Sequence, residues 1–219
     1  MRSKSQLVAY VTQKISVLKS VSNAYKKQRI TNKVQKNIVE PLSLHLGCGL
    51  TRFEEWLNID RFNVTGVTDI VWDLRNGIPV PDSSCRFIYS EHLLEHLSVN
   101  DGVALLRECY RVLCLGGVVR IAMPSLEEVV DIYVKDSWQT LGIDKMDAFK
   151  FVKTSAELIN MSFYWWEHQW LYDREELHRR LNEAGFSIIC DNEWGNSNYS
   201  ELQNLESRIE SKLICEARK

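Results

Sequence analysis

The sequence predicts an α/β protein built on a mostly parallel sheet that is covered on both faces. Short apolar runs alternate with helical patterns along most of the chain, and this alternation is typical of parallel strands joined by helical crossovers. Several of these runs end on glycine or on an acidic residue, at the sheet edge where ligands bind in such folds. With 219 residues, of which 45% are hydrophobic, the chain is long enough to bury one full core.

The apolar runs and turn signals predict seven strands and two well-defined helices. The strands are expected at LSLHLGCG, WLNID, TDIVWDL, RFIYS, VVRIAMP, FSIICD and SKLICEAR. One helix should begin near Asn100 or Asp101 and stop at the paired glycines Gly116 and Gly117. The other is DREELHRRLNEAGF, which Gly185 should end. Residues 125–170 are rich in aromatics and have no clear period, and we expect them to form a lid inserted in the domain.

A basic N-terminal arm precedes an acidic body. Residues 1–40 contain nine Lys or Arg against one acid, a net charge of +8, so that the rest of the chain carries −10. Val11, Ile15, Leu18, Val21 and Tyr25 recur at helical spacing and predict an amphipathic helix from residue 5 to about residue 28. Packing of this stripe on the domain at 41–219 is the favoured interpretation. Contact with an anionic membrane surface, a partner protein or nucleic acid is the alternative.

Location follows from what the sequence lacks. No apolar run is long enough for a transmembrane helix, and charged residues are scattered among the apolar residues of the N-terminal segment. Neither a membrane span nor a secretory signal is therefore expected. We expect a cytoplasmic protein, with peripheral contact to the inner membrane surface as a variant. The six cysteines contain no C-x-x-C pair, which predicts reduced and mostly buried thiols rather than a zinc ribbon or a disulfide framework.

Glycines and acids after the first three strands predict a nucleoside site. Gly47 and Gly49 directly follow the first strand, where missing side chains let the backbone approach a ligand. Asp60 ends the second strand, where it can bind two ribose hydroxyls, and Asp73 follows the third, where it can accept from an adenine amine. The chain has neither G-x-x-x-x-G-K-[ST] nor G-x-G-x-x-G at this position. The ligand is therefore expected to be an adenosine compound without a pyrophosphate.

The same segments resemble a known enzyme family. LHLGCG, LNID, DLRNGIPVPDSSCRFIYSEHLLEHL, LLRECYRVLCLGGVVRIAMPSLEEVV and HQWLYDREELHRRLNEAGF are similar, in that order, to motifs of class I S-adenosylmethionine-dependent methyltransferases. The closest likeness is to the small bacterial type-11 group found near polysaccharide and glycan genes, and it covers residues 41–219. It implies a Rossmann-like sheet whose last strand is antiparallel, with S-adenosylmethionine as the cofactor.

The resemblance also implies roles for individual residues. Gly47, Cys48 and Gly49 should contact the methionine part of the cofactor, and Asp60 its ribose. Asp73 and Leu74 should contact the adenine. Ser90, at the end of the fourth strand, is a further candidate contact.

The first crossover is unusually short for this family. About ten residues separate Gly49 from Asp60, too few for a crossover helix and a strand. LTRFEEW must then be a loop or a single turn, which leaves part of one sheet face open. We hypothesise that the N-terminal helix covers some of this face.

The segment YSEHLLEHL contains H-x-x-E-H at His92, Glu95 and His96. If a helix begins near Glu91, the three side chains share one face. The motif matches inverted zinc peptidases, but that interpretation leaves the glycines and strand-end acids unexplained. Some methyltransferases of quinones and small-RNA 3′ ends have E-x-x-E-H here and can hold a divalent ion. The favoured interpretation is structural, with no metal; His92, Glu95 and His96 are the alternative metal set, and His168 a further ligand.

Methyl transfer requires alignment of the reactants and, for a hydroxyl acceptor, a base. His92, His96 and His168 lie on segments expected to face the cleft and are the candidate catalytic residues. The leading hypothesis is O-methylation of a small molecule or glycan, with nucleic acid disfavoured by the acidic body. A metal-assisted methyltransferase of RNA 3′ ends or quinones is one alternative. A non-catalytic module that binds S-adenosylmethionine is the other.

Overall fold

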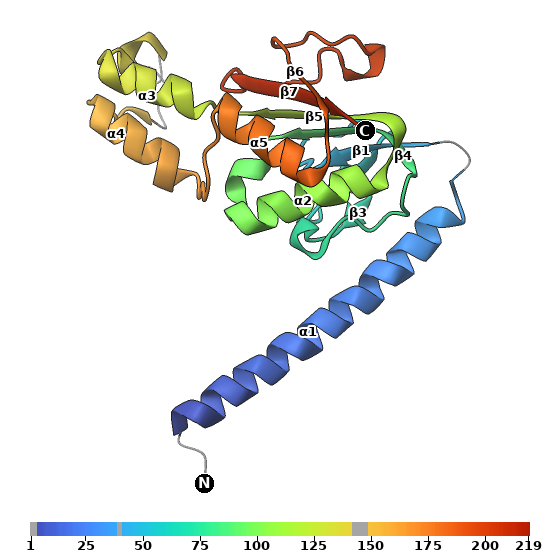
Figure 1. Cartoon of the computed structure of the whole chain (residues 1–219). Coiled ribbons are helices and arrows are strands. Elements are labelled where there is room, and N and C mark those ends of the chain that lie inside the picture. Colours follow the sequence, from blue (N-terminus) through green and yellow to red (C-terminus); the bar gives the residue numbers. More distant parts are fainter. Residues whose placement is uncertain (1–3, 39–40, 142–148) are drawn as a thin grey trace.

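The protein is organised around a single seven-stranded sheet. The computed structural model describes residues 4–38, 41–141 and 149–219, and its strand order is β3-β2-β1-β4-β5-β7-β6 (Figure 1). β7 pairs antiparallel with β5 and β6, whereas the pairs among β1 to β5 are parallel. The Rossmann-like sheet with an antiparallel last strand is confirmed. The strand order reverses between β1 and β4, which places the expected ligand site beyond their carboxyl ends.

All seven predicted strands are present. They are β1 (Leu42–Leu46), β2 (Leu57–Asp60), β3 (Ile70–Val71), β4 (Cys85–Glu91), β5 (Leu113–Met123), β6 (Ile188–Asp191) and β7 (Leu213–Arg218). The α-helices are α1 (Lys4–Gln35), α2 (Val99–Val112), α3 (Leu126–Val134), α4 (Ser155–Asn160) and α5 (Arg174–Ala184).

Two boundaries of α2 differ from the prediction. Ser98, rather than Asn100 or Asp101, caps the helix by accepting from the backbone N of Asp101 at 3.2 Å. The helix ends at Val112 and passes directly into β5, so that the paired glycines lie within the strand. A Cβ on Gly117 would lie 3.0 Å from the carbonyl oxygens of Cys85 and Arg86. This glycine therefore permits close strand pairing and does not stop the helix, whereas Gly185 does end α5 with a φ of 113°.

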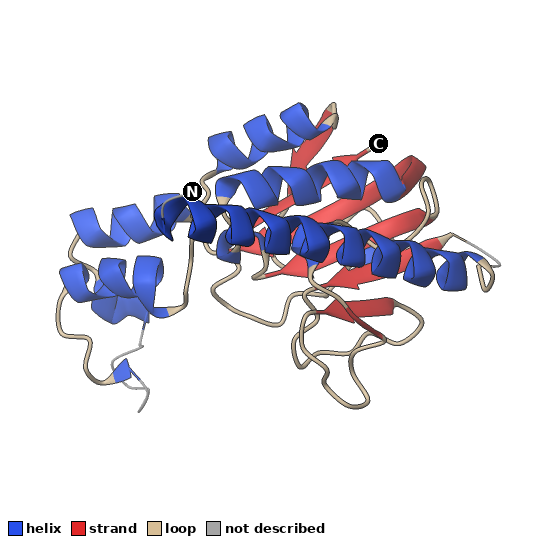
Figure 2. Ribbon diagram, turned by 90° about the horizontal axis from the view of Figure 1, so that it is seen from below, coloured by secondary structure: helices blue, strands red, loops and turns tan. Residues whose placement is uncertain are grey.

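One face of the sheet is covered by helices. Figure 2 shows α1, α2 and α5 on the same side of the strands. Alternate strand residues such as Leu44, Ile59 and Ile121 join Leu106 of α2 and Leu177 of α5 in one buried cluster. Burial of this cluster is the main stabilising contribution to the fold.

Loops cover the opposite face. The segment between β1 and β2 forms no helix, as predicted, and its Phe53 ring stacks on His45 with the centroids 4.2 Å apart. The connection between β6 and β7 adds apolar side chains from the far end of the chain. These are Tyr199, Leu202 and Leu205, which pack with Phe87, Tyr89 and Val118 of the central strands.

The N-terminal helix does not cover that face. Ile30 and Val34 of α1 pack against the cluster on the α2 side of the sheet. Connections between parallel strands are right-handed, and the connection from β1 to β2 runs across the sheet in the direction opposite to that from β4 to β5, which contains α2. A helix between β1 and β2 would therefore lie on the face opposite α2. The hypothesis that α1 replaces the missing crossover helix is therefore wrong.

The predicted apolar stripe of α1 is also exposed. Leu18, Val21 and Tyr25 are 69%, 62% and 72% exposed, so the prediction that this stripe packs on the domain is wrong. Over the whole length of α1 the apolar residues are not confined to one face. Contact of residues 5–28 with a membrane or protein stays a prediction. No described helix, α1 included, is long and apolar enough to cross a membrane.

The cysteines agree with the prediction of reduced thiols. All six are free, and Cys48, Cys85, Cys109 and Cys215 are buried. Cys114 is half-buried and Cys190 is exposed. Burial raises the pKa of the Cys109 and Cys215 thiols, which keeps them protonated and unreactive.

Glu108 on α2 anchors the C-terminal part of α1. Its Oε2 accepts from Lys27 Nζ and from the backbone N of Ile78, both at 2.7 Å, and its Oε1 accepts from Arg111 Nε at 2.6 Å. Burial alone would raise the pKa of Glu108, but these hydrogen bonds outweigh it and lower the pKa to about 2.

Glu108→Gln should lower the free energy of unfolding at pH 7 by about 1–3 kcal/mol. Because the folded pKa lies below the ordinary value of 4.5, the carboxylate stabilises the fold fully above that value and loses its effect as the pH falls towards 2. Urea denaturation should therefore show a smaller difference between the two proteins at pH 3 than at pH 7. Glu210→Gln, at an exposed position, is the control. An equal difference at both pH values would contradict this account.

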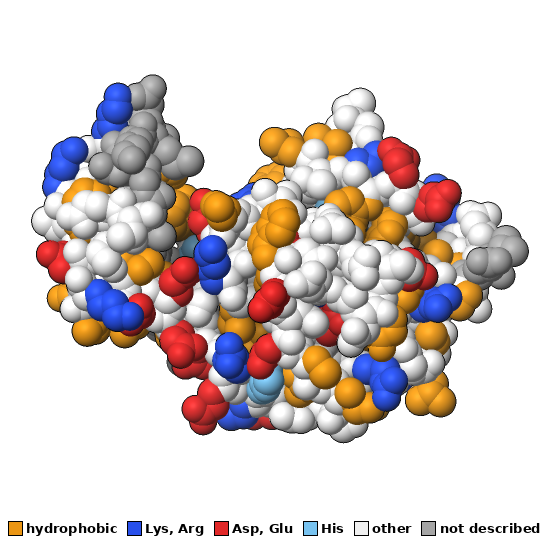
Figure 3. All heavy atoms as spheres, turned by 90° about the horizontal axis from the view of Figure 1, so that it is seen from above, with side chains coloured by type: hydrophobic (Ala, Val, Ile, Leu, Met, Phe, Trp, Pro, Cys, Tyr) orange, Lys and Arg blue, Asp and Glu red, His pale blue; other side chains and the backbone are white. Residues whose placement is uncertain are grey.

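A lobe of short helices stands beside the sheet. It comprises α3, the turn η3 (Trp138–Leu141), α4 and the π-helical turn η6 (Met161–Trp165), with a small core of its own around Trp138, Val152 and Leu158. A bridge between Ser125 and Tyr172 joins its two ends. Figure 3 shows a hollow between this lobe and the main body. We call the described residues 125–141 and 149–172 the lid lobe; residues 142–148 of the predicted lid lie outside the described chain.

Candidate active site

The loop after β1 is folded around the carboxylate of Asp60. Gly47 and Gly49 have φ angles of 68° and 53°, a conformation that favours glycine. The backbone N of Gly49 donates to Asp60 Oδ2 at 3.0 Å, and that of Phe62 donates to Asp60 Oδ1 at 2.8 Å. Asp60 thus fixes the positions of the backbone on both sides of the strand ends.

Asp73 follows β3 and begins the 3-10 turn η1 (Leu74–Asn76). It accepts from the backbone N of Arg75 at 3.0 Å and from Arg75 Nε at 2.9 Å. The hydrogen bond from the Arg75 side chain lowers the pKa of Asp73, so that Asp73 is ionised at neutral pH. A second acid thus lies at the end of the strand next to that of Asp60, where the sequence predicted it.

A cavity of about 380 Å³ opens beyond these strand ends, which is within the usual range of about 300–1,000 Å³ for small-molecule sites. Most of the predicted residues line it: Gly47, Gly49, Asp60, Asp73, Leu74, His92 and His96. Cys48 and Ser90 are buried and are not among its lining residues. The Cys48 thiol lies 4.0 Å from Thr68 Oγ1 instead.

The H-x-x-E-H segment is not the start of a helix. His92 has a φ of 49°, in the left-handed region, and only a 3-10 turn, η2 (Leu94–His96), follows before α2 begins at Val99. The predicted helical face is therefore wrong. His92 Nδ1 nevertheless lies 3.2 Å from Glu95 Oε1, because the left-handed residue turns the chain back on itself.

The lid lobe is hydrogen-bonded to η2. The backbone N atoms of Gln169 and Trp170 donate to the carbonyl of Glu95 at 2.8 and 3.2 Å, and Gln169 Nε2 donates to the carbonyl of His96 at 2.7 Å. These bonds bring His168 beside His96, with the ring centroids 4.8 Å apart. Of the three predicted catalytic histidines, His92 and His96 therefore line the cavity, and His168 lies behind them in contact with His96 but does not line it.

Burial governs the charge of this cluster. It lowers the pKa of His92 and of His96 to about 4, and it also lowers the pKa of His168. The same effect raises the pKa of Glu95 to about 8. At neutral pH the three imidazoles are neutral and Glu95 is largely protonated.

The metal set expected from the sequence is only partly brought together. Glu95, His96 and His168 have ligand atoms that all lie within 4.8 Å of one another, and His92 is outside this group. His168 takes the place that the sequence assigned to His92. The difference arises because the helix that would have aligned His92 with His96 is absent.

Several lining residues were missed by the sequence analysis. They are Arg61, Phe62, Trp72, Arg75, Glu91, Leu93, Leu97, Glu167, Gln169 and Arg208, whereas Trp166 belongs to the aromatic segment that was predicted as a lid. Glu91 ends β4 and accepts from the backbone N atoms of Ser207 and Arg208, both at 3.0 Å, and from Ser211 Oγ at 2.7 Å. These bonds hold Arg208 at the cavity. The position of Glu91 at a strand end was a usable signal, whereas the loop that carries Arg208 has no motif.

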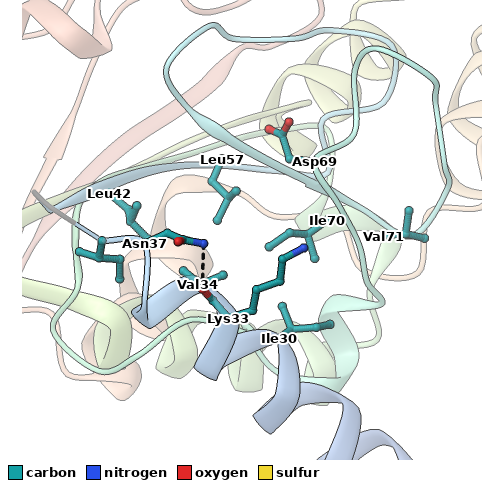
Figure 4. A pocket seen from close by; sticks show the side chains of 10 residues that line it. Ile30, Lys33, Val34, Asn37, Leu42, Leu57, Asp69, Ile70 and Val71 are labelled. Atoms are coloured by element: carbon teal, nitrogen blue, oxygen red, sulfur yellow. Dashed lines mark hydrogen bonds between the residues drawn. The ribbon is translucent and has the colours of Figure 1, made fainter.

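A second cavity, of about 440 Å³, lies between the end of α1 and the edge strands (Figure 4). Its lining is mostly apolar, with Ile30, Leu42, Leu57 and Ile70 pointing inwards. Asn37 donates from Nδ2 to the carbonyl of Lys33 at 3.1 Å. The polar groups suited to catalysis lie at the first cavity, which we take as the candidate active site.

One part of the chain matches a known protein family. Residues 44–121, which span β1 to β5, match the family described as a methyltransferase domain. This segment of the chain is similar to a methyltransferase domain, as the resemblance of the sequence led us to expect. No curated protein matches its sequence significantly.

Solved structures of methyltransferases are similar to this one at low identity. A SAM-dependent methyltransferase from Archaeoglobus fulgidus is 14% identical with a TM-score of 0.47, over 90% of this chain and 94% of that one. A SAM-dependent methyltransferase from Thermotoga maritima, described as a possible histamine N-methyltransferase, is 15% identical with a TM-score of 0.49, over 96% of both chains. One from Mesorhizobium loti is 17% identical with a TM-score of 0.48, over 83% and 92%.

The residues that line this cavity fit S-adenosylmethionine. Gly49 leaves the backbone of the β1 loop open to a ligand, since a Cβ there would meet nothing within 4 Å, whereas a Cβ on Gly47 would lie 3.0 Å from Leu93 Cδ1. Asp60 and Asp73 supply acceptors at neighbouring strand ends, and Trp72 and Leu74 supply apolar surface beside them. The same cavity therefore offers polar contacts for a ribose and an apolar surface for a purine.

Proposed function

We propose that this chain is an S-adenosylmethionine-dependent methyltransferase that methylates an oxygen atom of a small molecule or a glycan. The supporting observation is that one cavity is lined both by the glycine loop with the strand-end acids and by His92 and His96, which burial keeps neutral. A hydroxyl acceptor must lose a proton during transfer, and a neutral imidazole is suited to take it.

The residues of the cavity divide into two groups in this proposal. Asp60 binds the ribose hydroxyls, and Asp73 with Leu74 binds the adenine. When bound, S-adenosylmethionine supplies an electrophilic methyl group. His92 accepts the acceptor's proton at its ring nitrogen, while Trp166 and Gln169 of the lid lobe orient the acceptor and exclude water. Aromatic side chains of this kind also suit the apolar face of a sugar ring.

The test is methyl transfer from isotope-labelled S-adenosylmethionine to a panel of sugar nucleotides, lipid-linked glycans and phenolic small molecules. We expect label in one acceptor class, as an O-methyl group identified by NMR. His92→Gln should lower kcat/KM about 10²- to 10⁴-fold and leave cofactor affinity unchanged. His178→Gln, far from the cavity on α5, is the control.

Three results would count against the proposal. Methylation of nitrogen or carbon would contradict the oxygen acceptor. Full activity of His92→Gln would remove His92 as the base. A chain that binds S-adenosylmethionine tightly but transfers its methyl group neither to any acceptor nor to the protein itself would be a non-catalytic binding module instead.

A further inference from the structure

Three side chains that can bind a metal ion meet where the lid lobe contacts η2. The ligand atoms of Glu95, His96 and His168 all lie within 4.8 Å of one another. Two imidazoles and one carboxylate are the donors found around Zn²⁺ and other divalent transition metals. We propose that these three residues form a binding site for one such ion, at the histidine end of the cavity.

Glu95 is the first reason to expect a cation. Its side chain is fully buried, and neither carboxylate oxygen has a hydrogen-bond partner of good geometry among the described residues; His92 Nδ1 lies 3.2 Å from Oε1. Buried polar groups are nearly always hydrogen-bonded, and those that are not require an explanation. A bound cation explains why an acidic side chain occupies this position, since it would compensate the buried carboxylate directly.

The hydrogen bond of His168 is the second reason. Its Nδ1 lies 2.6 Å from the carbonyl oxygen of Ser162, and because a carbonyl only accepts, Nδ1 carries the proton. Nε2 is then left with a lone pair. Metal-binding histidines almost always donate their other ring N–H to a carbonyl or a carboxylate in this way. The ring is thus already in the tautomer that a ligand needs.

The main chain also holds the three residues in place. Gln169, next to His168, is bonded through its backbone N to the Glu95 carbonyl and through Nε2 to the His96 carbonyl. The lid lobe therefore brings a ligand to a site whose other two ligands lie on adjacent residues of η2. Such support of the ligands by surrounding hydrogen bonds is what positions a metal site.

A second cluster offers a useful contrast. His178, Asp191 and Cys215 also approach within 4.8 Å. Here His178 Nε2 is bonded to Asp191 Oδ1 at 2.9 Å, and Asp191 also pairs with Arg174 at 3.3 Å. Its polar atoms are already satisfied by one another, and burial raises the pKa of the Cys215 thiol. An ion is therefore favoured at Glu95, His96 and His168.

A role for the ion in methyl transfer follows from its position, and this part of the inference rests on the proposed function. Because His96 lines the cavity beside His92, an ion bound there could hold the acceptor hydroxyl and lower its pKa. His92 would take the proton, the oxygen would form a bond to the methyl carbon, and the methyl–sulfur bond would break to leave a neutral thioether. The nitrogen ligands favour Zn²⁺, Co²⁺, Fe²⁺ or Mn²⁺ over Mg²⁺, which prefers oxygen ligands.

Metal binding can be measured without any methyl acceptor, which keeps this test separate from that of the proposed function. The full chain is treated with a chelator, dialysed and titrated with CoCl₂, with visible absorption as the readout and ZnCl₂ as the competitor. We expect one equivalent of Co²⁺ to bind and Zn²⁺ to displace it. Glu95→Gln and His168→Gln should each weaken Co²⁺ binding at least 10-fold, whereas His178→Gln should leave it unchanged.

Glu95→Gln keeps the side-chain volume, and thermal denaturation will show whether it folds. If Glu95→Gln does not fold, His168→Gln, at a half-buried position on the lid lobe, is sufficient to test the proposal. The proposal is overturned if the native chain binds no ion, if His168→Gln binds as tightly as the native chain, or if only His178→Gln loses binding.

Discussion

Replacing Arg120 with methionine should lower the free energy of unfolding by about 3–5 kcal/mol, because it leaves two buried carboxylates without a partner. Arg120 is fully buried on β5. Its Nε donates to Glu206 Oε1 at 2.6 Å, and its Nη1 donates to Glu216 Oε1 at 2.7 Å and to the carbonyl of Asn196 at 2.8 Å. Methionine fills similar space but supplies none of these donors.

Urea denaturation followed by circular dichroism measures this effect. Arg218→Met on β7, where the side chain is exposed, is the matched control and should change stability by less than about 0.5 kcal/mol. Replacing Glu206 and Glu216 with glutamine in the Arg120→Met protein should recover part of the loss, since the uncompensated charges are then removed. Equal losses for Arg120→Met and Arg218→Met would contradict the argument.

Asp60→Ala should weaken binding of S-adenosylmethionine at least 100-fold, which corresponds to about 2.7 kcal/mol. Two effects combine in this variant. The carboxylate that we assign to the ribose is lost, and so are the acceptors for the backbone N atoms of Gly49 and Phe62. The glycine loop would then no longer be held open against the cofactor.

Isothermal titration calorimetry measures the affinity, and two further variants separate the effects. Asp60→Asn keeps one carbonyl oxygen for the loop and should bind more tightly than Asp60→Ala but less tightly than the native chain. Asp131→Ala, on α3 in an exposed ion pair with Lys135, should bind as the native chain does. Native affinity in a folded Asp60→Ala protein would show that the ribose is bound elsewhere.

The sequence predicted the sheet and the cofactor end of the site because both depend on local patterns. Buried strands are short apolar runs, and their ends are marked by Gly47, Gly49, Asp60 and Asp73. Parallel strands bring their ends to one edge whatever the intervening chain does. All seven strands consequently lie where they were predicted, and Gly47, Gly49, Asp60, Asp73 and Leu74 line the cavity, whereas Cys48 and Ser90 do not.

The arrangement of the histidines could not be predicted, because it depends on contacts between segments that lie far apart in the sequence. His168 meets His96 only because Gln169 and Trp170 are bonded to η2, and Arg208 reaches the cavity only because Glu91 binds its loop. His92 adopts a left-handed conformation where a helical pattern predicted a helix. Similarly, the spacing of apolar residues in α1 predicted a helix but did not determine what, if anything, it packs against.

The hydrogen bonds of Glu91 and of Gln169 hold two different sides of the candidate active site, and they hold them in different ways. On one side, the loop with Arg208 is fixed to the end of a central strand by a carboxylate. On the other, a lobe with its own core has its two ends joined by the Ser125–Tyr172 bridge, and its Gln169 and Trp170 donate main-chain hydrogen bonds to the carbonyl of Glu95. Substitutions in the lobe would therefore change the lining at Trp166, Glu167 and Gln169 and leave the strand ends that carry Gly47, Gly49 and Asp60 unaltered.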